Sequence, residues 1–170
     1  MNDSFILRDR IWREQNERVT LSSNATFASK SLGRYLDEEP DAFRTCFERD
    51  RDRIIHSKTF RRLKHKTQVF INPDGDHFIT RMTHTLNVTQ IGRSIAKTLG
   101  LNPDLTEAIC LGHDVGHSPF GHTGEEVLND MLDGGWSHSE NSVRMLSVIE
   151  PLNLTKETIN GIEKHPWRYE

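Results

Sequence analysis

A short stretch of the chain, AICLGHDVGHSPFGHTGEE at residues 108–126, gathers three histidines, one aspartate and two glutamates between glycines. Neutral imidazole is the commonest metal-binding side chain in proteins, and a nearby carboxylate adds the negative charge that a divalent cation requires. The residue types therefore predict a metal centre. The alternative is a polar loop that happens to be rich in histidine.

Two histidines continue the apolar stripes of consecutive predicted helices. In the first helix, residues three or four apart share one face: His84, Val88, Ile91, Ile95 and Leu99. In the second helix, residues four apart share one face: Leu105, Ile109 and His113. Because such a stripe faces the core, both imidazoles are expected to point inward. Gly112 and Gly116 bracket His113 and Asp114, so the helix end opens enough for this adjacent pair to meet one ion together with His84.

His122 and Glu125 stand at the start of a further predicted helix, for which Thr123 and Glu126 form a capping box. Cleavage of a phosphate ester needs a general acid that protonates the leaving oxygen, and a histidine held by a carboxylate near a metal suits that task. The backbone N–H groups of a helix start also favour an anionic substrate. The alternative, a solvated loop before an ordinary capped helix, is the better interpretation of His122 taken alone.

A basic segment at residues 49–66 carries eight Lys or Arg residues against two Asp residues. It is interpreted either as a solvated helix face or as a cradle for phosphate groups. Arg81 is a better individual candidate for phosphate, because one helical turn separates it from His84. A surface salt bridge is the alternative for Arg81.

The remaining pattern predicts an all-α fold with one small β-hairpin. Residues 1–40 are the least patterned and are predicted as an N-terminal arm or loop, and residues 41–170 as the helical domain. Asn102 and Thr155 are expected to cap helices. The hairpin would join Val69–Ile71 to Phe78–Thr80 through the turn residues between them.

The composition restricts the class of protein. The net charge is −3, with 22 basic and 25 acidic residues, which argues against a whole surface adapted to nucleic acid or to an anionic membrane. Cys46 and Cys110 are the only cysteines and lie in apolar helical contexts, so neither a disulfide framework nor a thiolate zinc site is predicted. We expect a protein of the reducing cytoplasm without a membrane partner.

Four ordered segments then resemble a known family. RMTHTLNV followed by LGHDVGHSPFGHTGEE is similar to the HD-domain metal-dependent phosphohydrolases. DRDRIIHSKTFRRLKHKTQVF and GGWSHSENSVRML narrow the resemblance to deoxyguanosinetriphosphate triphosphohydrolase-like proteins. The resemblance implies an all-α fold. It also implies hydrolysis of a deoxynucleoside triphosphate to deoxynucleoside and inorganic triphosphate.

The resemblance also implies roles for individual residues. The positions that match the family's metal ligands are His84, His113 and Asp114. Those that match the catalytic histidine and its acidic partner are His122 and Glu125. Those on the substrate side are Arg81, Lys66, His117 and His138. Mg or Mn is the expected cation, since a set of histidines and a carboxylate with open positions discriminates poorly between them.

The family's metal site has a fourth ligand, an aspartate on a helix far downstream, and the chain ends at Glu170 before reaching it. We therefore expect an N-terminal portion of such an enzyme, assembled as a homo-oligomer. Two alternatives stay open: another HD-type phosphohydrolase, or a catalytically incomplete subunit that binds nucleotide or forms oligomers. Single-stranded nucleic acid stays open as an effector, because the basic segment suits either partner.

Overall fold

The computed structural model describes residues 8–66 and 79–166, and these residues form helices and loops without a named strand. The α-helices are α1 (Arg10–Thr20), α2 (Cys46–His56), α3 (Lys58–Arg61), α4 (Arg81–Thr98), α5 (Pro103–Gly112), α6 (Gly121–Met131), α7 (His138–Arg144) and α8 (Lys156–Lys164). Short 3-10 turns cover Ala28–Lys30 and Arg62–His65, and a π-helical turn, Met145–Ile149, follows α7. The predicted all-α class is confirmed.

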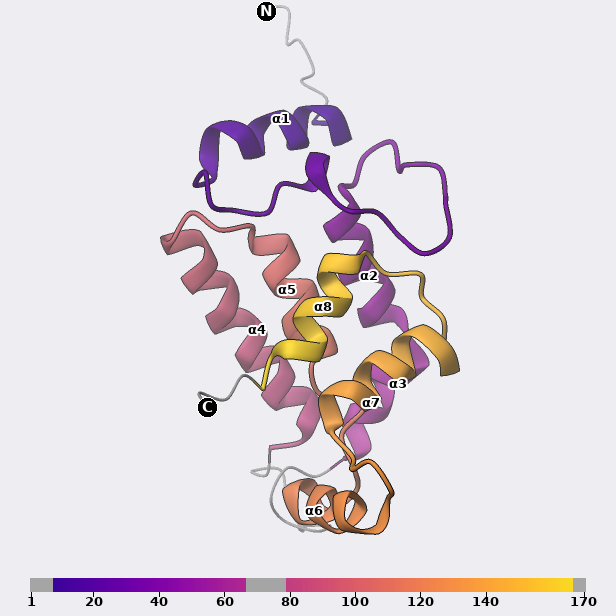
Figure 1. The fold of residues 1–170 in the computed structure, drawn as a ribbon. Coiled ribbons are helices and arrows are strands. Elements are labelled where there is room, and N and C mark those ends of the chain that lie inside the picture. The colour runs from indigo at the N-terminus through magenta and orange to yellow at the C-terminus, as the bar shows by residue number, and fades with distance from the viewer. Residues whose placement is uncertain (1–7, 67–78, 167–170) are drawn as a thin grey trace, which may run out of the picture.

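Helix α5 lies at the centre of the bundle (Figure 1). It packs against α4 on one side, α2 on another and α8 across a third. Nine buried side chains form the core around it: Ile54, Phe60, Leu63, Ala108, Leu111, Val115, Leu146, Leu154 and Ile162. The central position of α5 brings its C-terminal end, where His113 follows, into contact with most of the fold.

Several helix boundaries follow the predicted capping residues. Asn102 accepts the backbone N–H groups of Asp104 and Leu105, and Thr155 accepts that of Thr158. The predicted capping box of Thr123 and Glu126 is wrong, because α6 begins at Gly121, after Phe120 in a left-handed conformation (φ 65°). The earlier start places His122 in the first turn of α6.

The predicted inward stripe of α4 is also wrong. Ile91, Ile95 and Leu99 are exposed, whereas the buried residues of α4 are Arg81, Thr85, Thr89 and Ala96. Small side chains let α5 approach α4 closely, so compact residues occupy the contact and the larger apolar ones face outward. His84 lies half-buried between the two faces.

The segment predicted as an N-terminal arm or loop contains α1, which the sequence pattern did not predict. The helix has little apolar burial: Ile11 and Val19 are exposed. Polar contacts hold it instead, since Glu17 accepts the backbone N–H of Ala28 at 2.7 Å and the side-chain amide of Asn102 at 3.0 Å. The predicted boundary at residue 40 stays a prediction.

The predicted hairpin falls largely on residues 67–78, outside the described residues, and stays a prediction. Its last residue, Thr80, caps α4 through its side chain. Among the described residues, no helix combines the length and the apolar character needed to cross a membrane.

Asp50 on α2 links three parts of the chain through an ion pair and hydrogen bonds. Its carboxylate is fully buried and forms an ion pair with Arg34. It also accepts the hydroxyl of Thr155 at 2.6 Å and the hydroxyl of Thr158 at 2.7 Å, at the start of α8. A buried charge persists only where such partners replace water, so this network joins α2, α8 and the loop before α2.

We predict that Asp50→Ala lowers the free energy of unfolding by about 3–5 kcal/mol, because it removes the buried carboxylate that pairs with Arg34 and accepts the hydroxyls of Thr155 and Thr158. Asp52→Ala is the matched control on the same helix, since its ion pairs with Arg44 and Arg51 are partly exposed and should contribute at most about 1 kcal/mol. Urea unfolding measures both values. Equal effects of the two substitutions would contradict the role of Asp50 as the buried carboxylate that joins these parts of the chain.

Candidate active site

Three of the predicted site residues meet where α4 begins and α5 ends. His84 lies in the first turn of α4, His113 is the C-cap residue of α5, and Asp114 follows it. Each offers one ligand atom, and these three atoms lie within 4.8 Å of one another. The sequence therefore predicted correctly that these three side chains converge. The apolar stripe that was used to place His84 nevertheless faces solvent at Ile91, Ile95 and Leu99.

A backbone hydrogen bond orients the His113 ring. Its Nδ1 lies 2.7 Å from the carbonyl oxygen of Cys110, which only an N–H can satisfy. The Nε2 atom of the neutral ring then keeps its lone pair for a cation. Burial lowers the pKa of His113, which favours this neutral form.

Arg81 holds the carboxylate of Asp114. One guanidinium nitrogen, Nη1, lies 3.0 Å from each of the two carboxylate oxygens, and both side chains are buried. Burial acts to raise the pKa of Asp114, but the charge of Arg81, its hydrogen bonds and the neighbouring histidines together outweigh burial, so the pKa stays below its ordinary value and the group is ionised. Arg81 is thus placed against a metal-site carboxylate rather than on the surface.

Helix α7 fixes the backbone that follows Asp114. A Cβ atom on Gly116 would lie 2.2 Å from the backbone nitrogen of Ser142, so only glycine permits this contact. The Ser142 hydroxyl accepts the N–H of Gly116 at 2.9 Å, and the Asn141 amide donates to the carbonyl of Gly116 at 2.7 Å. The loop that carries the site residues is therefore anchored through its main chain.

A second polar group lies beside the first. His117, Glu125 and His138 also bring one ligand atom each within 4.8 Å of one another. The His117 ring stacks on that of His138, with centroids 4.9 Å apart. The Nε2 atom of His117 is buried 4.0 Å from a Glu125 oxygen and has no hydrogen-bond partner among the described residues. Such a nitrogen needs a ligand or a water to satisfy it.

His122 faces solvent beside this second group. Its side chain is 79% exposed, and its Nδ1 lies 3.3 Å from Oε2 of Glu125. The other carboxylate oxygen accepts both the backbone N–H and the ring Nδ1 of His138, at 3.0 Å and 2.8 Å. A cavity of about 680 Å³ opens here, lined by His122, Glu125, Glu126, Asn129, Trp136, Ser137, His138 and Pro166. The predicted pair therefore borders a space of ligand size.

His165, which the sequence did not single out, connects the two groups. It is the C-cap residue of α8, and its Nδ1 lies 2.7 Å from the carbonyl of Ile162. Its Nε2 meets Nε2 of His138 at 2.9 Å, and its ring lies 5.2 Å from that of His113. A signal was present, because His165 follows Ile159 and Ile162 at steps of three, as His113 follows Leu105 and Ile109 at steps of four.

His138 and His165 form a continuous chain of polar contacts. Nδ1 of His138 meets Glu125, the Nε2 atoms of the two rings meet each other, and Nδ1 of His165 meets the Ile162 carbonyl oxygen. Burial lowers the pKa of His165, which favours its neutral form.

Lys66 reaches the site from the 3-10 turn after α3. Its Nζ donates to the carbonyl oxygens of Val115 and His117, at 3.1 Å and 2.9 Å. Burial lowers the pKa of Lys66 to about 8. In the rest of the basic segment, Arg49, Arg51 and Arg53 form ion pairs with acidic side chains, whereas Lys66 lies against the loop that carries the site residues.

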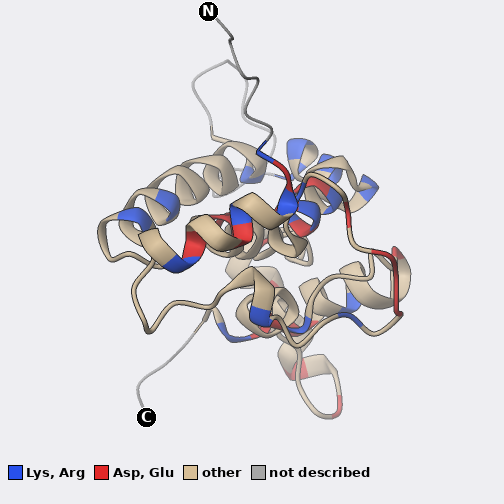
Figure 2. Cartoon of the chain, turned by 90° about the horizontal axis from the view of Figure 1, so that it is seen from above, with Lys and Arg blue, Asp and Glu red and all other residues tan. Residues whose placement is uncertain are grey.

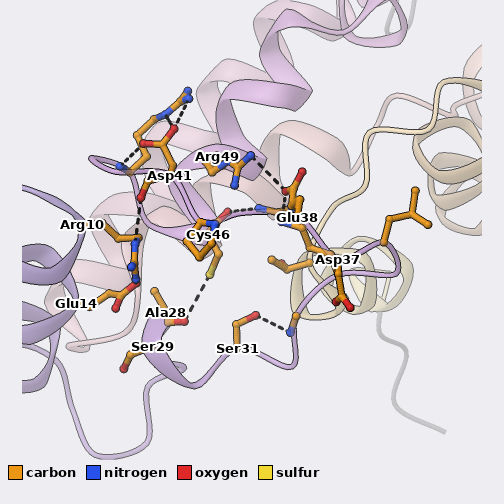
Figure 3. Close-up of a pocket in the computed structure, with 16 residues that line it drawn as sticks. Arg10, Glu14, Ala28, Ser29, Ser31, Asp37, Glu38, Asp41, Cys46 and Arg49 are labelled. Carbon is orange, nitrogen blue, oxygen red and sulfur yellow. Dashed lines mark hydrogen bonds and ion pairs between the residues drawn. The ribbon is translucent and has the colours of Figure 1, made fainter.

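Another cavity, of about 300 Å³, lies between α1 and the loop before α2 (Figure 3). Four arginines line it: Arg10, Arg34, Arg44 and Arg49. Each of them pairs with a carboxylate. Because their charges are already compensated, this cavity lacks the free positive charge that an anion site requires.

The donor set of His84, His113 and Asp114 fits a divalent cation. Two imidazoles and one ionised carboxylate are ordinary ligands, the free Nε2 of His113 is oriented by its backbone bond, and Arg81 supports the carboxylate from behind. Three protein ligands leave coordination positions open, which is typical of a catalytic site rather than a structural one.

Comparison with known proteins identifies relatives of this chain. The sequence profile described as HD domain matches residues 81–170, which is more than half of the chain. The chain is 60% identical over 156 residues to a deoxyguanosinetriphosphate triphosphohydrolase-like protein of Caldanaerobacter subterraneus subsp. tengcongensis, covering 89% of this chain and 46% of that protein. Proteins with the same description from Clostridium tetani and Clostridium perfringens (strain SM101 / Type A) are 54% and 57% identical, over 96% and 89% of this chain and 47% and 46% of theirs. The chain thus spans about half the length of these relatives.

We predict that His113→Ala weakens Mn²⁺ binding at least about 100-fold, because it removes a directly ligating nitrogen. Calorimetric titration of metal-free protein measures the affinity. His56→Ala, which removes an exposed histidine on α2, is the control and should bind as the wild type does. Unchanged binding by His113→Ala would refute this ligand set.

We also predict a pH dependence from His117. Burial, with Arg81 nearby, lowers its pKa from 6.5 to about 4. Between these values the unfolded chain binds a proton that the folded protein does not, so the free energy of unfolding falls as the pH is lowered through this window.

His117→Gln removes this titrating group, so the free energy of unfolding should fall less steeply as the pH is lowered. Urea unfolding of metal-free protein between about pH 7 and about pH 4.5 measures it. His56→Gln is the control and should keep the wild-type slope. A wild-type slope in His117→Gln would contradict the burial of a neutral His117.

Proposed function

The chain belongs to the HD domain family, and from this premise we propose that it hydrolyses deoxynucleoside triphosphates to deoxynucleoside and inorganic triphosphate. One observation carries the proposal. The donor group of His84, His113 and Asp114 adjoins a histidine–carboxylate group at a cavity of about 680 Å³, and His165 contacts both. The relatives' shared description supports the substrate class.

His84, His113 and Asp114 would hold the divalent cation, for which we propose Mg or Mn. When bound, the cation supplies a Lewis acid that stabilises negative charge on a phosphoryl oxygen. Asp114 stays ionised because Arg81 compensates its charge, and His113 stays neutral because it is buried. The protein thus maintains both ligands in the protonation states that bind a cation.

In the proposed reaction, water forms a bond to the α-phosphorus and the bond from this phosphorus to the 5′ oxygen breaks. The 5′ oxygen takes a proton, and His122 is the proposed donor because its exposed ring borders the cavity. Glu125 would orient His122 through the 3.3 Å contact with its Nδ1. This is the common arrangement of an acid–base histidine held by a carboxylate.

The remaining predicted residues would bind the phosphate chain. His117 and His138 lie beside Glu125, and we propose that they line the substrate side of the site, where bound substrate or a water would satisfy the buried Nε2 of His117. For Arg81 and Lys66 we propose contact with the triphosphate in addition to their bonds to Asp114 and to the loop carbonyls. The hydrogen bonds to these carbonyls hold the ammonium group of Lys66 against the loop.

A second candidate function is a catalytically incomplete subunit that binds nucleotide. The chain spans about half the length of the relatives, so the activity of the whole relatives is a proposal for it. Homo-oligomer formation and a single-stranded nucleic acid effector belong to either proposal. We propose the reducing cytoplasm as the compartment, consistent with two unpaired cysteines.

Incubation of the protein with each deoxynucleoside triphosphate and Mn²⁺ tests the two functions. We expect deoxynucleoside and intact triphosphate in equal amounts by chromatography, and His122→Ala should lower kcat by about 10²–10⁴-fold with little effect on Mn²⁺ binding. His65→Ala, which alters an exposed histidine, is the control. Release of pyrophosphate or single phosphate would refute the proposed reaction, and metal binding without turnover would favour the second function.

A further inference from the structure

His165 stands apart from the two donor groups of the site. Neither group includes it, and it does not line the cavity beside His122. It is half-buried at the C-cap of α8, with its ring centroid 5.2 Å from that of His113 and 5.0 Å from that of His138. A side chain that lies between two groups, without a place in either, is suited to hold them in a fixed relation.

Close packing fixes the position of His165 relative to α5. A Cβ atom on Gly112 would lie 2.4 Å from Cδ1 of Ile162, and one on Gly161 would lie 2.2 Å from Cδ1 of Ile109. Glycine at both positions therefore lets α8 lie directly on α5. Nδ1 of His165 lies 2.7 Å from the carbonyl oxygen of Ile162, a fully buried residue. The His165 ring is thus anchored to the contact between the two helices.

His165 in turn fixes the ring of His138. The Nε2 atoms of the two rings lie 2.9 Å apart, and Nδ1 of His138 lies 2.8 Å from Oε1 of Glu125. If the His138 ring turned over, carbon atoms would take the places of both nitrogens and both contacts would be lost. His138 therefore has one preferred orientation, which His165 and Glu125 set from opposite ends of the ring.

The same contacts reach the proposed acid, His122. Among the described residues, Glu125 is the one within hydrogen-bonding distance of the His122 side chain, with Oε2 3.3 Å from Nδ1. The ring of His117 lies edge-on to His122, with centroids 5.2 Å apart, and stacks on His138. Both neighbours that orient the exposed ring of His122 are therefore themselves in contact with His138.

The link through His165 differs from the ion pairs elsewhere in the fold. Charged residues of both signs lie on α1 and α2 (Figure 2), and the pair of Arg13 and Glu48 joins these two helices. The ion pairs of histidine in the described part of the chain involve His117, His122 and His138 but not His165. A hydrogen bond weakens steeply when its angle changes. The link therefore constrains direction as well as distance.

We propose that His165 is a positioning residue, which holds Glu125 and His138 in a fixed place relative to the cation ligands. The inference rests on the proposed function, in which His122 and the cation act on the same phosphate group. A misplacement of about 1 Å can lower a rate about 10²-fold. Without the imidazole of His165, His138 loses one of its two polar partners, and His122 loses its fixed relation to α5.

The variant His165→Phe tests this role, because phenylalanine keeps the ring and removes both nitrogens. We expect kcat for deoxynucleoside triphosphate hydrolysis with Mn²⁺ to fall about 10–100-fold, with KM and the Kd for Mn²⁺ little changed. His165→Gln should recover part of this loss, since its amide can contact Nε2 of His138. His56→Phe, at an exposed position of α2, is the matched control and should keep the wild-type kcat.

Equal kcat values for the wild type and His165→Phe would overturn the proposal. So would a loss of one bound Mn²⁺ per chain in His165→Phe, because His165 would then be a metal ligand. A second measurement needs no folded variant. Nitrogen-15 NMR of the metal-free wild type should show a scalar coupling across the hydrogen bond between the Nε2 atoms of His138 and His165, and its absence would also overturn the proposal.

The NMR measurement also separates this inference from the proposed reaction. In His165→Phe, the ring signals of His122 should shift together with those of His138, whereas those of His56 should stay in place. Unshifted His122 signals would overturn the proposal whether or not the protein turns over substrate. A wild-type chain that releases no triphosphate would refute the proposed reaction, and the spectra would still decide whether His165 positions His138 and His122.

Discussion

The contact between the loop after α5 and the start of α7 is the constraint on which the site depends. Glycine at position 116 lets the two backbones meet, and Ser142 and Asn141 then satisfy the main-chain groups of that residue. Lys66 takes the carbonyls on either side of it. With these backbone polar groups satisfied internally, the loop is anchored and holds its side chains in place.

The two groups of side chains differ in their electrostatics. In the first, an ionised Asp114 lies between Arg81 and a neutral, buried His113, which suits a cation. In the second, Glu125 holds the imidazoles of His122 and His138 beside a cavity, where ring N–H groups can reach a ligand. A metal-dependent phosphohydrolase needs both, with the cation and the acid on the same phosphate group. The geometry supports that division of tasks.

Sequence patterns predicted the helix starts at Asn102 and Thr155, since capping depends on a local hydrogen bond. They failed for α4, where Ile91 faces solvent, because the direction of a stripe depends on what packs against the helix. His84, His113 and Asp114 were predicted as metal ligands because their spacing and the resemblance to a known family indicated the same residues. His165 was missed, since its contacts with residues far away in sequence exist only in the folded chain.

The central claim is that the cation occupies the group formed by His84, His113 and Asp114, and that the adjoining group of His117, Glu125 and His138 faces the phosphate chain. Anomalous diffraction at the manganese edge, from crystals grown with Mn²⁺ and a non-hydrolysable deoxynucleotide, tests it most directly. The account predicts one strong peak about 2.0–2.3 Å from the donor atoms of these three residues. A peak on the group of His117, Glu125 and His138 instead, with the first group empty, would contradict it.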